Sequence, residues 1–199
     1  MAILPFNLHG YLFQKGVDDI RQAYDATIAA LKARHENAQS ELVRLRKAIA
    51  DDELGPIEYS EEGEELYDKE TLQEMMTDDA AVTISMARSS YIVLLHHHWE
   101  KHCDVWMRSK NYCYKNAYKW LERRGINVDK VQLDVLRRGS NTIKHNNREL
   151  FDEAAALFEF SGGVPGTDIA NALRLDETHV DKLFGAVSRS GPNVDSAIF

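Results

Sequence analysis

Residues 136–147 of this chain, LRRGSNTIKHNN, concentrate side chains that can act on a phosphate group. On an α-helix, Asn141 and His145 are separated by four residues and share a face. Arg138 precedes His145 by seven residues, or two turns, and falls on that face within about 20°. One face of such a helix would therefore carry a guanidinium, an amide and an imidazole.

These side-chain types suit metal-independent cleavage of RNA. A histidine can remove the proton of a 2′-hydroxyl or return one to the leaving 5′-oxygen. An arginine can hold the phosphate through two hydrogen bonds and stabilise charge that builds on it. Arg137 at one edge of the face is a second candidate for this role. Lys144, at the other edge, and Asn141 would assist.

The same residues also fit a purely structural interpretation. His145 would then end the helix and interact with its C-terminal dipole. Arg138 would form an ion pair with Asp134, four residues earlier. Gly139 is unfavourable inside a helix, which favours either a close approach at that position or a helix that starts at Ser140.

The pair Arg138-x6-His145 resembles the Arg-x4–6-His motif of the HEPN family of all-α nucleases and interaction domains. The resemblance extends over residues 18–160, where a long helix and a shorter one precede the Arg/His helix. The sequence departs from the family pattern after the arginine, where the polar residue comes at Asn141 and Gly139 follows Arg138 directly.

The HEPN resemblance implies an endoribonuclease that needs no cofactor and works at a homodimer interface, where two Arg/His sets face each other. Many members of the family are toxins or antiviral effectors, so an antitoxin or a defence-system protein is an implied partner. The alternative function is a non-catalytic HEPN-like module that binds a protein partner or a nucleotide.

The helices that must position this face are predicted from apolar spacing and from helix-capping residues. Residues 57–164 contain no proline, which favours long helices and an all-α fold. We expect a helical bundle over 1–160 with an acidic loop at 51–70, and a linker, packing helices and a tail over 161–199. Within these, an N-terminal arm is expected over 1–15. Helices are expected over 18–50, over 71–108 (with a break near 77–79), over 112–124, from Asn127 or Asp129 onward, and over 148–160, 168–173 and 176–188.

Charge is distributed unevenly along the 199 residues. The net charge is −8, which by itself argues against a nucleic-acid partner. Residues 51–70, however, carry −9, whereas residues 101–148 carry +8 with interleaved aromatic residues. The basic stretch suits RNA, and four of its cations are candidate RNA contacts: Lys115, Lys119, Arg123 and Arg124. The acidic segment is expected either to be solvated or to cover the basic surface.

The remaining histidines and the two cysteines give weaker signals. His98 and His102 are four residues apart, but Glu100 does not occupy the position that a zinc-peptidase helix requires, so no metal site is expected. Cys103 and Cys113 are expected to be reduced. With no signal-peptide pattern and no long apolar stretch, the chain is expected to be cytoplasmic and not bound to a membrane.

Overall fold

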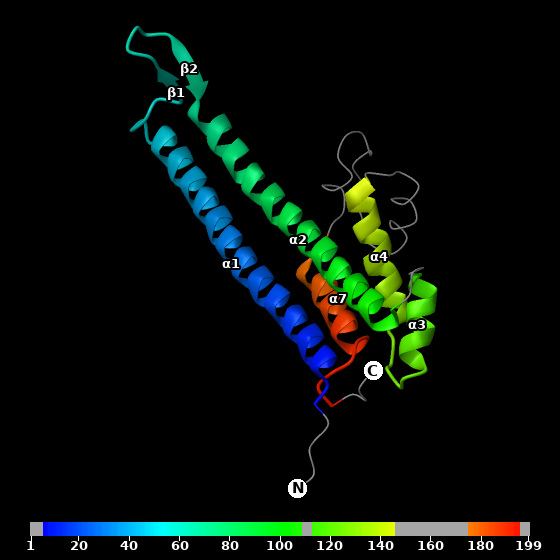
Figure 1. Cartoon of the computed structure of the whole chain (residues 1–199). Helices are drawn as coiled ribbons and strands as arrows, with labels where there is room; N and C mark the ends of the chain where they lie inside the picture. The colour runs from blue at the N-terminus through cyan, green and yellow to red at the C-terminus, as the bar shows by residue number, and fades with distance from the viewer. Residues whose placement is uncertain (1–5, 109–112, 146–174, 196–199) are drawn as a thin grey trace. The chain divides into compact units, whose positions relative to one another are not determined.

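The computed structural model describes residues 6–108, 113–145 and 175–195, and it is all-α apart from one small hairpin, as predicted (Figure 1). The predicted helices at 148–160 and 168–173 and the predicted linker at 161–166 lie outside these residues. In chain order the elements are α1 (Leu8–Ala50), β1 (Ile57–Tyr59), β2 (Glu65–Asp68), α2 (Lys69–Met107), α3 (Tyr114–Glu122), α4 (Lys130–His145) and α7 (Glu177–Arg189).

Helix α1 begins ten residues earlier than predicted. The cap is Asn7, not Asp18 or Asp19: the buried side chain of Asn7 accepts a hydrogen bond from the backbone N–H of Gly10 at 3.0 Å. The prediction of an N-terminal arm over residues 1–15 was therefore wrong from Leu8 onward.

Three other helices begin after an aspartate cap. The carboxylates of Asp68, Asp129 and Asp176 each accept a hydrogen bond from the backbone N–H three residues later, at 2.7, 3.2 and 2.8 Å respectively. Helix α2 then continues without the break expected near residues 77–79. After α3 the chain turns at Gly125, whose φ of +76° is a conformation that glycine adopts readily.

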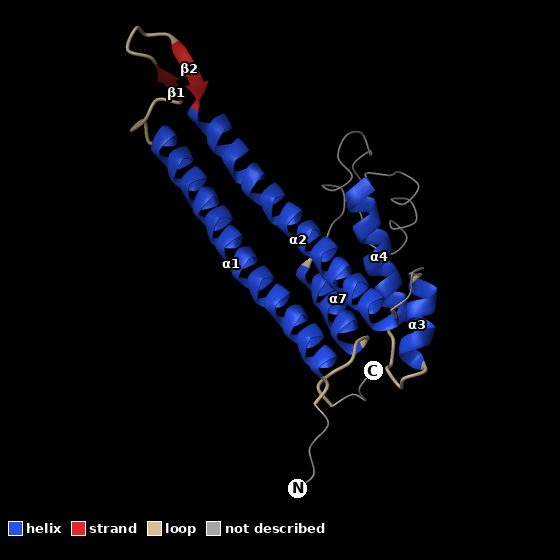
Figure 2. Ribbon diagram, in the orientation of Figure 1, coloured by secondary structure: helices blue, strands red, loops and turns tan. Residues whose placement is uncertain are grey.

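The acidic segment is more ordered than a loop. Strands β1 and β2 form an antiparallel hairpin that pairs Ile57 with Asp68 and Glu58 with Tyr67 (Figure 2). Gly63, with φ of +83°, lies in the connecting turn. The sequence prediction missed these strands because they are only three and four residues long, too short for a clear alternation of apolar and polar residues.

The described chain divides into two compact units, and α1 and α2 contribute to both. One unit spans residues 26–87, where α1 and α2 run antiparallel and end in the β-hairpin (Figure 1). Within it, Gln73 donates to the carbonyl of Ala38 at 3.0 Å, and His35 Nδ1 lies 3.2 Å from the carbonyl of Thr77. Arg46 pairs with Glu70 and Glu74 nearer the hairpin. Residues later in α1 thus contact residues earlier in α2, as an antiparallel pair of helices requires.

The second unit contains the start of α1, the end of α2, α3, α4 and α7. Its aromatic core includes Phe13, which stacks on His98 at 5.3 Å between ring centroids and meets Trp106 edge-on at 5.2 Å. Gly16 leaves room for the His98 ring, because a Cβ at this position would overlap it. Gly191 does the same for Phe13.

The C-terminal residues are part of this core, at least as far as residue 195. Gln14 donates to the carbonyl oxygens of Ser188 and Pro192 at 2.9 and 3.1 Å, and Asn7 donates to that of Val194 at 3.0 Å. The expectation of a loose tail over the last eleven residues was therefore wrong for the described residues 189–195. The tail contains few apolar residues, and backbone hydrogen bonds of this kind leave no periodic signal in a sequence.

Helix α7 packs against α4. The hydroxyl of Ser190, just after α7, accepts from the backbone N–H of Asp129 at 2.9 Å, and Arg189 pairs with the Asp129 carboxylate at 3.2 Å. The predicted division of the chain at 160/161 lies outside the described residues, whereas α7 itself belongs to the same unit as α4. Across the described parts of the chain, no helix is both long enough and apolar enough to span a membrane.

Candidate functional site

Helix α4 presents the predicted polar face. It is continuous from Lys130 to His145, so the four- and seven-residue spacings place Arg138, Asn141 and His145 on one side. Arg138 and Asn141 are half-buried and His145 is exposed, whereas Ser140 on the other side of the helix is fully buried. The helix does not start at Ser140, and His145 is its last residue.

Arg137 has a different environment from Arg138. Its guanidinium lies over the ring of Tyr114, 4.3 Å from the centroid, and its Nε is 3.6 Å from a carboxylate oxygen of Asp134. The buried Tyr118 hydroxyl donates to the same oxygen of Asp134 at 3.2 Å, and burial together with this carboxylate raises the pKa of Tyr118. Arg137 therefore joins α3 to α4, which makes it a structural residue.

His96 of α2 lies beside the basic edge of α4. The side chain is 3% exposed, and its Nδ1 is 3.5 Å from Glu100 Oε2. Burial, together with the positive charges of Lys144, His97 and Arg137, lowers the pKa of His96 to about 3. His96 is consequently neutral at physiological pH, and a neutral imidazole is the form that tolerates two neighbouring cations.

The predicted RNA contacts on α3 and the turn after it are all exposed: Lys115, Lys119, Arg123 and Arg124. Arg124 is the most constrained of them. Its guanidinium carbon lies 3.6 Å from the centroid of the Trp120 ring, and its Nη1 donates to the Trp120 carbonyl at 3.3 Å. The same unit thus carries both the polar face of α4 and the exposed cations of α3.

The other paired histidines belong to the aromatic core. The rings of His98 and His102 are 4.5 Å apart, and His98 Nε2 lies 3.0 Å from the carbonyl oxygen of Phe13. Burial lowers the pKa of His98, and it lowers the pKa of His102 to about 4. Among residues 6–108, 113–145 and 175–195, no three histidine, cysteine or carboxylate side chains are grouped as metal ligands would be.

Sequence reasoning missed three side chains that shape this region, namely His96, Tyr114 and Asp134 in its role beside Arg137. His96 stands in a run of three histidines, and only its burial in the folded unit, at 3% exposure against 54% for His97, distinguishes it from that neighbour. The spacing of Asp134 and Arg137, three residues apart on a helix, is the one signal available in the sequence.

Comparison of the chain with protein-family models, with curated proteins and with solved structures finds no match.

Proposed function

We propose that this protein is a metal-independent endoribonuclease of the HEPN type that cleaves RNA at a homodimer interface. The observation that carries the proposal is the common face of α4 on which Arg138, Asn141 and His145 lie, with the imidazole exposed at the helix end. These three side-chain types are ones that can bind a phosphate and transfer a proton, and they lie together on the accessible side of one helix.

The reaction needs a proton acceptor and a group that stabilises a charged phosphorane. His145 takes the proton of the RNA 2′-hydroxyl, and the 2′-oxygen attacks the adjacent phosphorus. The bond from phosphorus to the 5′-oxygen breaks, and that oxygen receives a proton from a protonated imidazole. The products are a 2′,3′-cyclic phosphate and a 5′-hydroxyl. Arg138 holds the non-bridging oxygens, and Asn141 orients the phosphate or the ring.

The structure favours Arg138 over Arg137 as the phosphate ligand. Arg137 lies over the Tyr114 ring, 4.3 Å from its centroid, and its Nε is 3.6 Å from the Asp134 carboxylate. To bind a phosphate, Arg137 would have to leave a ring and a carboxylate that it already contacts. Lys144 is exposed at the neighbouring edge of α4 and adds positive charge to the RNA-binding surface.

A second copy of the chain supports this chemistry in two ways. His145 is exposed on a single chain, and covering it would exclude water and strengthen its electrostatic contacts with the substrate. Two facing imidazoles would also supply one base and one acid. An antitoxin or defence-system partner would then act by blocking this face or by keeping the two copies apart.

The test is RNA cleavage in EDTA by the wild-type protein and by matched variants. We expect His145→Ala and Arg138→Ala each to lower the rate by at least about 100-fold. His97→Ala and Arg44→Ala, which remove exposed side chains of the same types elsewhere, are expected to cleave at the wild-type rate. Wild-type rates in the first two variants, or cleavage only after a divalent metal is added, would refute the proposal.

The alternative function, a module that binds a protein partner, has its own supporting observation. In the unit that spans residues 26–87, Leu72, Met75 and Val82 recur at three- and seven-residue spacing and are 40%, 60% and 41% exposed. The opposite side of α2 is buried, with Thr77 at 9% and Ala80 at 2% exposure. An exposed apolar stripe with this spacing is typical of a helix that packs against another helix.

Charge identifies the kind of partner that would fit this stripe. Residues 26–87 contain fifteen acidic and six basic residues, a net charge of −9. A second copy would bring the same negative charge to the contact, whereas an amphipathic helix with basic flanks would be attracted. The partner we propose is therefore a basic amphipathic helix of another protein.

This alternative is tested with a peptide of about three heptads that has leucine at the a and d positions and lysine elsewhere. We expect it to bind, a glutamate version not to bind, and the double variant Met75→Gln/Val82→Gln to weaken binding. Leu66→Gln changes an equally exposed leucine outside the stripe and serves as the control. Equal binding of both peptides would rule the alternative out.

A further inference from the structure

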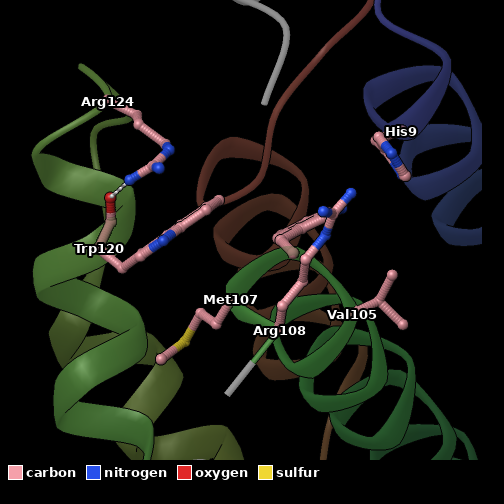
Figure 3. Close-up of a pocket in the computed structure, with 7 residues that line it drawn as sticks. His9, Val105, Met107, Arg108, Trp120 and Arg124 are labelled. Carbon is pink, nitrogen blue, oxygen red and sulfur yellow. Dashed lines mark hydrogen bonds between the residues drawn. The ribbon is translucent and has the colours of Figure 1, made fainter.

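A pocket of about 350 Å³ lies where the end of α2, α3 and the first turn of α1 meet (Figure 3). All of its lining residues belong to one compact unit. Among the residues that the structure describes, the lining combines aromatic, apolar and basic side chains without a carboxylate: His9, Val105, Trp106, Met107, Arg108, Trp120 and Arg124. This composition points to a ligand that is both flat and anionic.

The aromatic part of the pocket is rigid. Trp120 is half-exposed, and the guanidinium of Arg124 lies against its ring at 3.6 Å and is also hydrogen-bonded to its carbonyl. Trp106 is 6% exposed and contacts the rings of Phe13 and His102 at centroid distances of 5.2 and 5.6 Å. Trp120, the more exposed of the two rings, therefore offers a stacking surface at little cost in conformational entropy.

The basic part of the pocket centres on Arg108, which is exposed. In Figure 3 its guanidinium lies in the space between Trp120 and His9. No carboxylate among the described residues pairs with it. Its backbone has φ of +47°, in the left-handed region that usually takes glycine just after a helix.

We propose that this pocket binds one nucleotide, with the base stacked on Trp120 and the phosphate held by Arg108 and Arg124. A base has the flat face that an indole accepts, and the phosphate has the charge that the two arginines neutralise. The nucleotide belongs to the RNA strand that the protein cleaves, and in this respect the inference rests on the proposed function. The pocket then anchors the strand away from the Arg138/His145 face.

The experiment measures binding of a fluorescently labelled single-stranded RNA and, separately, of 5′-AMP. The RNA arm uses the His145→Ala background so that cleavage does not interfere. We expect Trp120→Leu and Arg108→Gln each to weaken RNA binding roughly tenfold, and Arg108→Gln to lower the salt dependence of log K by about one charge. Lys101→Gln, an exposed cation of α2 outside the pocket, is the control.

The outcomes separate the pocket from the catalytic face. Weakened RNA binding in both pocket variants, with a wild-type circular dichroism spectrum, supports the proposal for a nucleotide within a strand. Weakened binding of 5′-AMP alone assigns the pocket to a free nucleotide and overturns the strand assignment. Wild-type binding of both ligands overturns the nucleotide pocket altogether. The 5′-AMP measurement does not depend on whether His145→Ala abolishes cleavage, so a failure of the pocket and a failure of the proposed function are distinguishable.

Discussion

The guanidinium of Arg137 lies 4.3 Å from the centroid of the Tyr114 ring, so that a residue of α4 is anchored on a residue of α3. The neighbouring Arg138 points to the polar face of the same helix, which it shares with Asn141 and His145. Two adjacent arginines thus have separate tasks. One holds two helices together, and the other is the proposed phosphate ligand.

This division predicts different results for substitutions of Arg137. Arg137→Ala removes the contact with Tyr114 and leaves the carboxylate of Asp134 without its cation, which we expect to cost about 1–3 kcal/mol in the free energy of unfolding. Urea denaturation followed by circular dichroism measures the change. Arg44→Ala, at an exposed position of α1, is the control and should stay within about 0.5 kcal/mol of wild type. A loss for Arg137→Ala no larger than that of the control would contradict the assignment.

The packing of the C-terminal segment predicts that Gly191 tolerates no side chain. A Cβ at this position would overlap the buried ring of Phe13, so we expect Gly191→Ala to destabilise the protein by about 1–3 kcal/mol. Gly55→Ala is the matched control, because a Cβ there would meet only a carbonyl oxygen at 4.0 Å. Thermal unfolding of the two variants checks the prediction, which fails if both melt at the wild-type temperature.

Burial of His96 predicts a loss of stability in acid. The pKa of His96 is lowered to about 3 in the folded protein, from an ordinary value of 6.5, so the unfolded chain binds more protons between these values. The stability that depends on neutral His96 is therefore complete above pH 6.5 and declines as the pH falls toward 3. Stability measured by urea denaturation across this window should decline less steeply in His96→Gln. His97→Gln, which changes an exposed neighbour, should retain the wild-type dependence of the free energy of unfolding on pH. The same dependence in all three proteins would show that burial of His96 does not cause the loss of stability in acid.

The two cysteines are expected to react at different rates. Cys103 is 1% exposed, and burial raises the pKa of its thiol well above the ordinary value, whereas Cys113 is partly exposed. We expect one thiol per chain to react with a disulfide reagent in the native state and two in urea. Mass spectrometry of the labelled peptides should assign the native reaction to Cys113. Rapid native labelling of Cys103 would show that α2 is not packed as described.

Local signals in the sequence predicted the all-α fold, the helix that carries Arg138 and His145, and a start of this helix at Asn127 or Asp129, of which Asp129 is the cap. Each of these depends on spacing along one helix or on one residue beside its end. The early start of α1 was missed although Phe13, Val17 and Tyr24 follow helical spacing, because Gly10 and Gly16 in the same stretch are poor helix formers. The His96 environment and the Arg137–Tyr114 contact depend on how α2, α3 and α4 pack, and residues distant in sequence give no such information.

The proposed function requires His145 to take part in RNA cleavage without a metal ion. The measurement incubates a 5′-labelled single-stranded RNA with wild type and His145→Ala in EDTA and identifies the new ends. We expect wild type to produce fragments that end in a 2′,3′-cyclic phosphate and His145→Ala to produce almost none. Intact RNA with the wild-type protein, or equal amounts of the same fragments from both proteins, would contradict it.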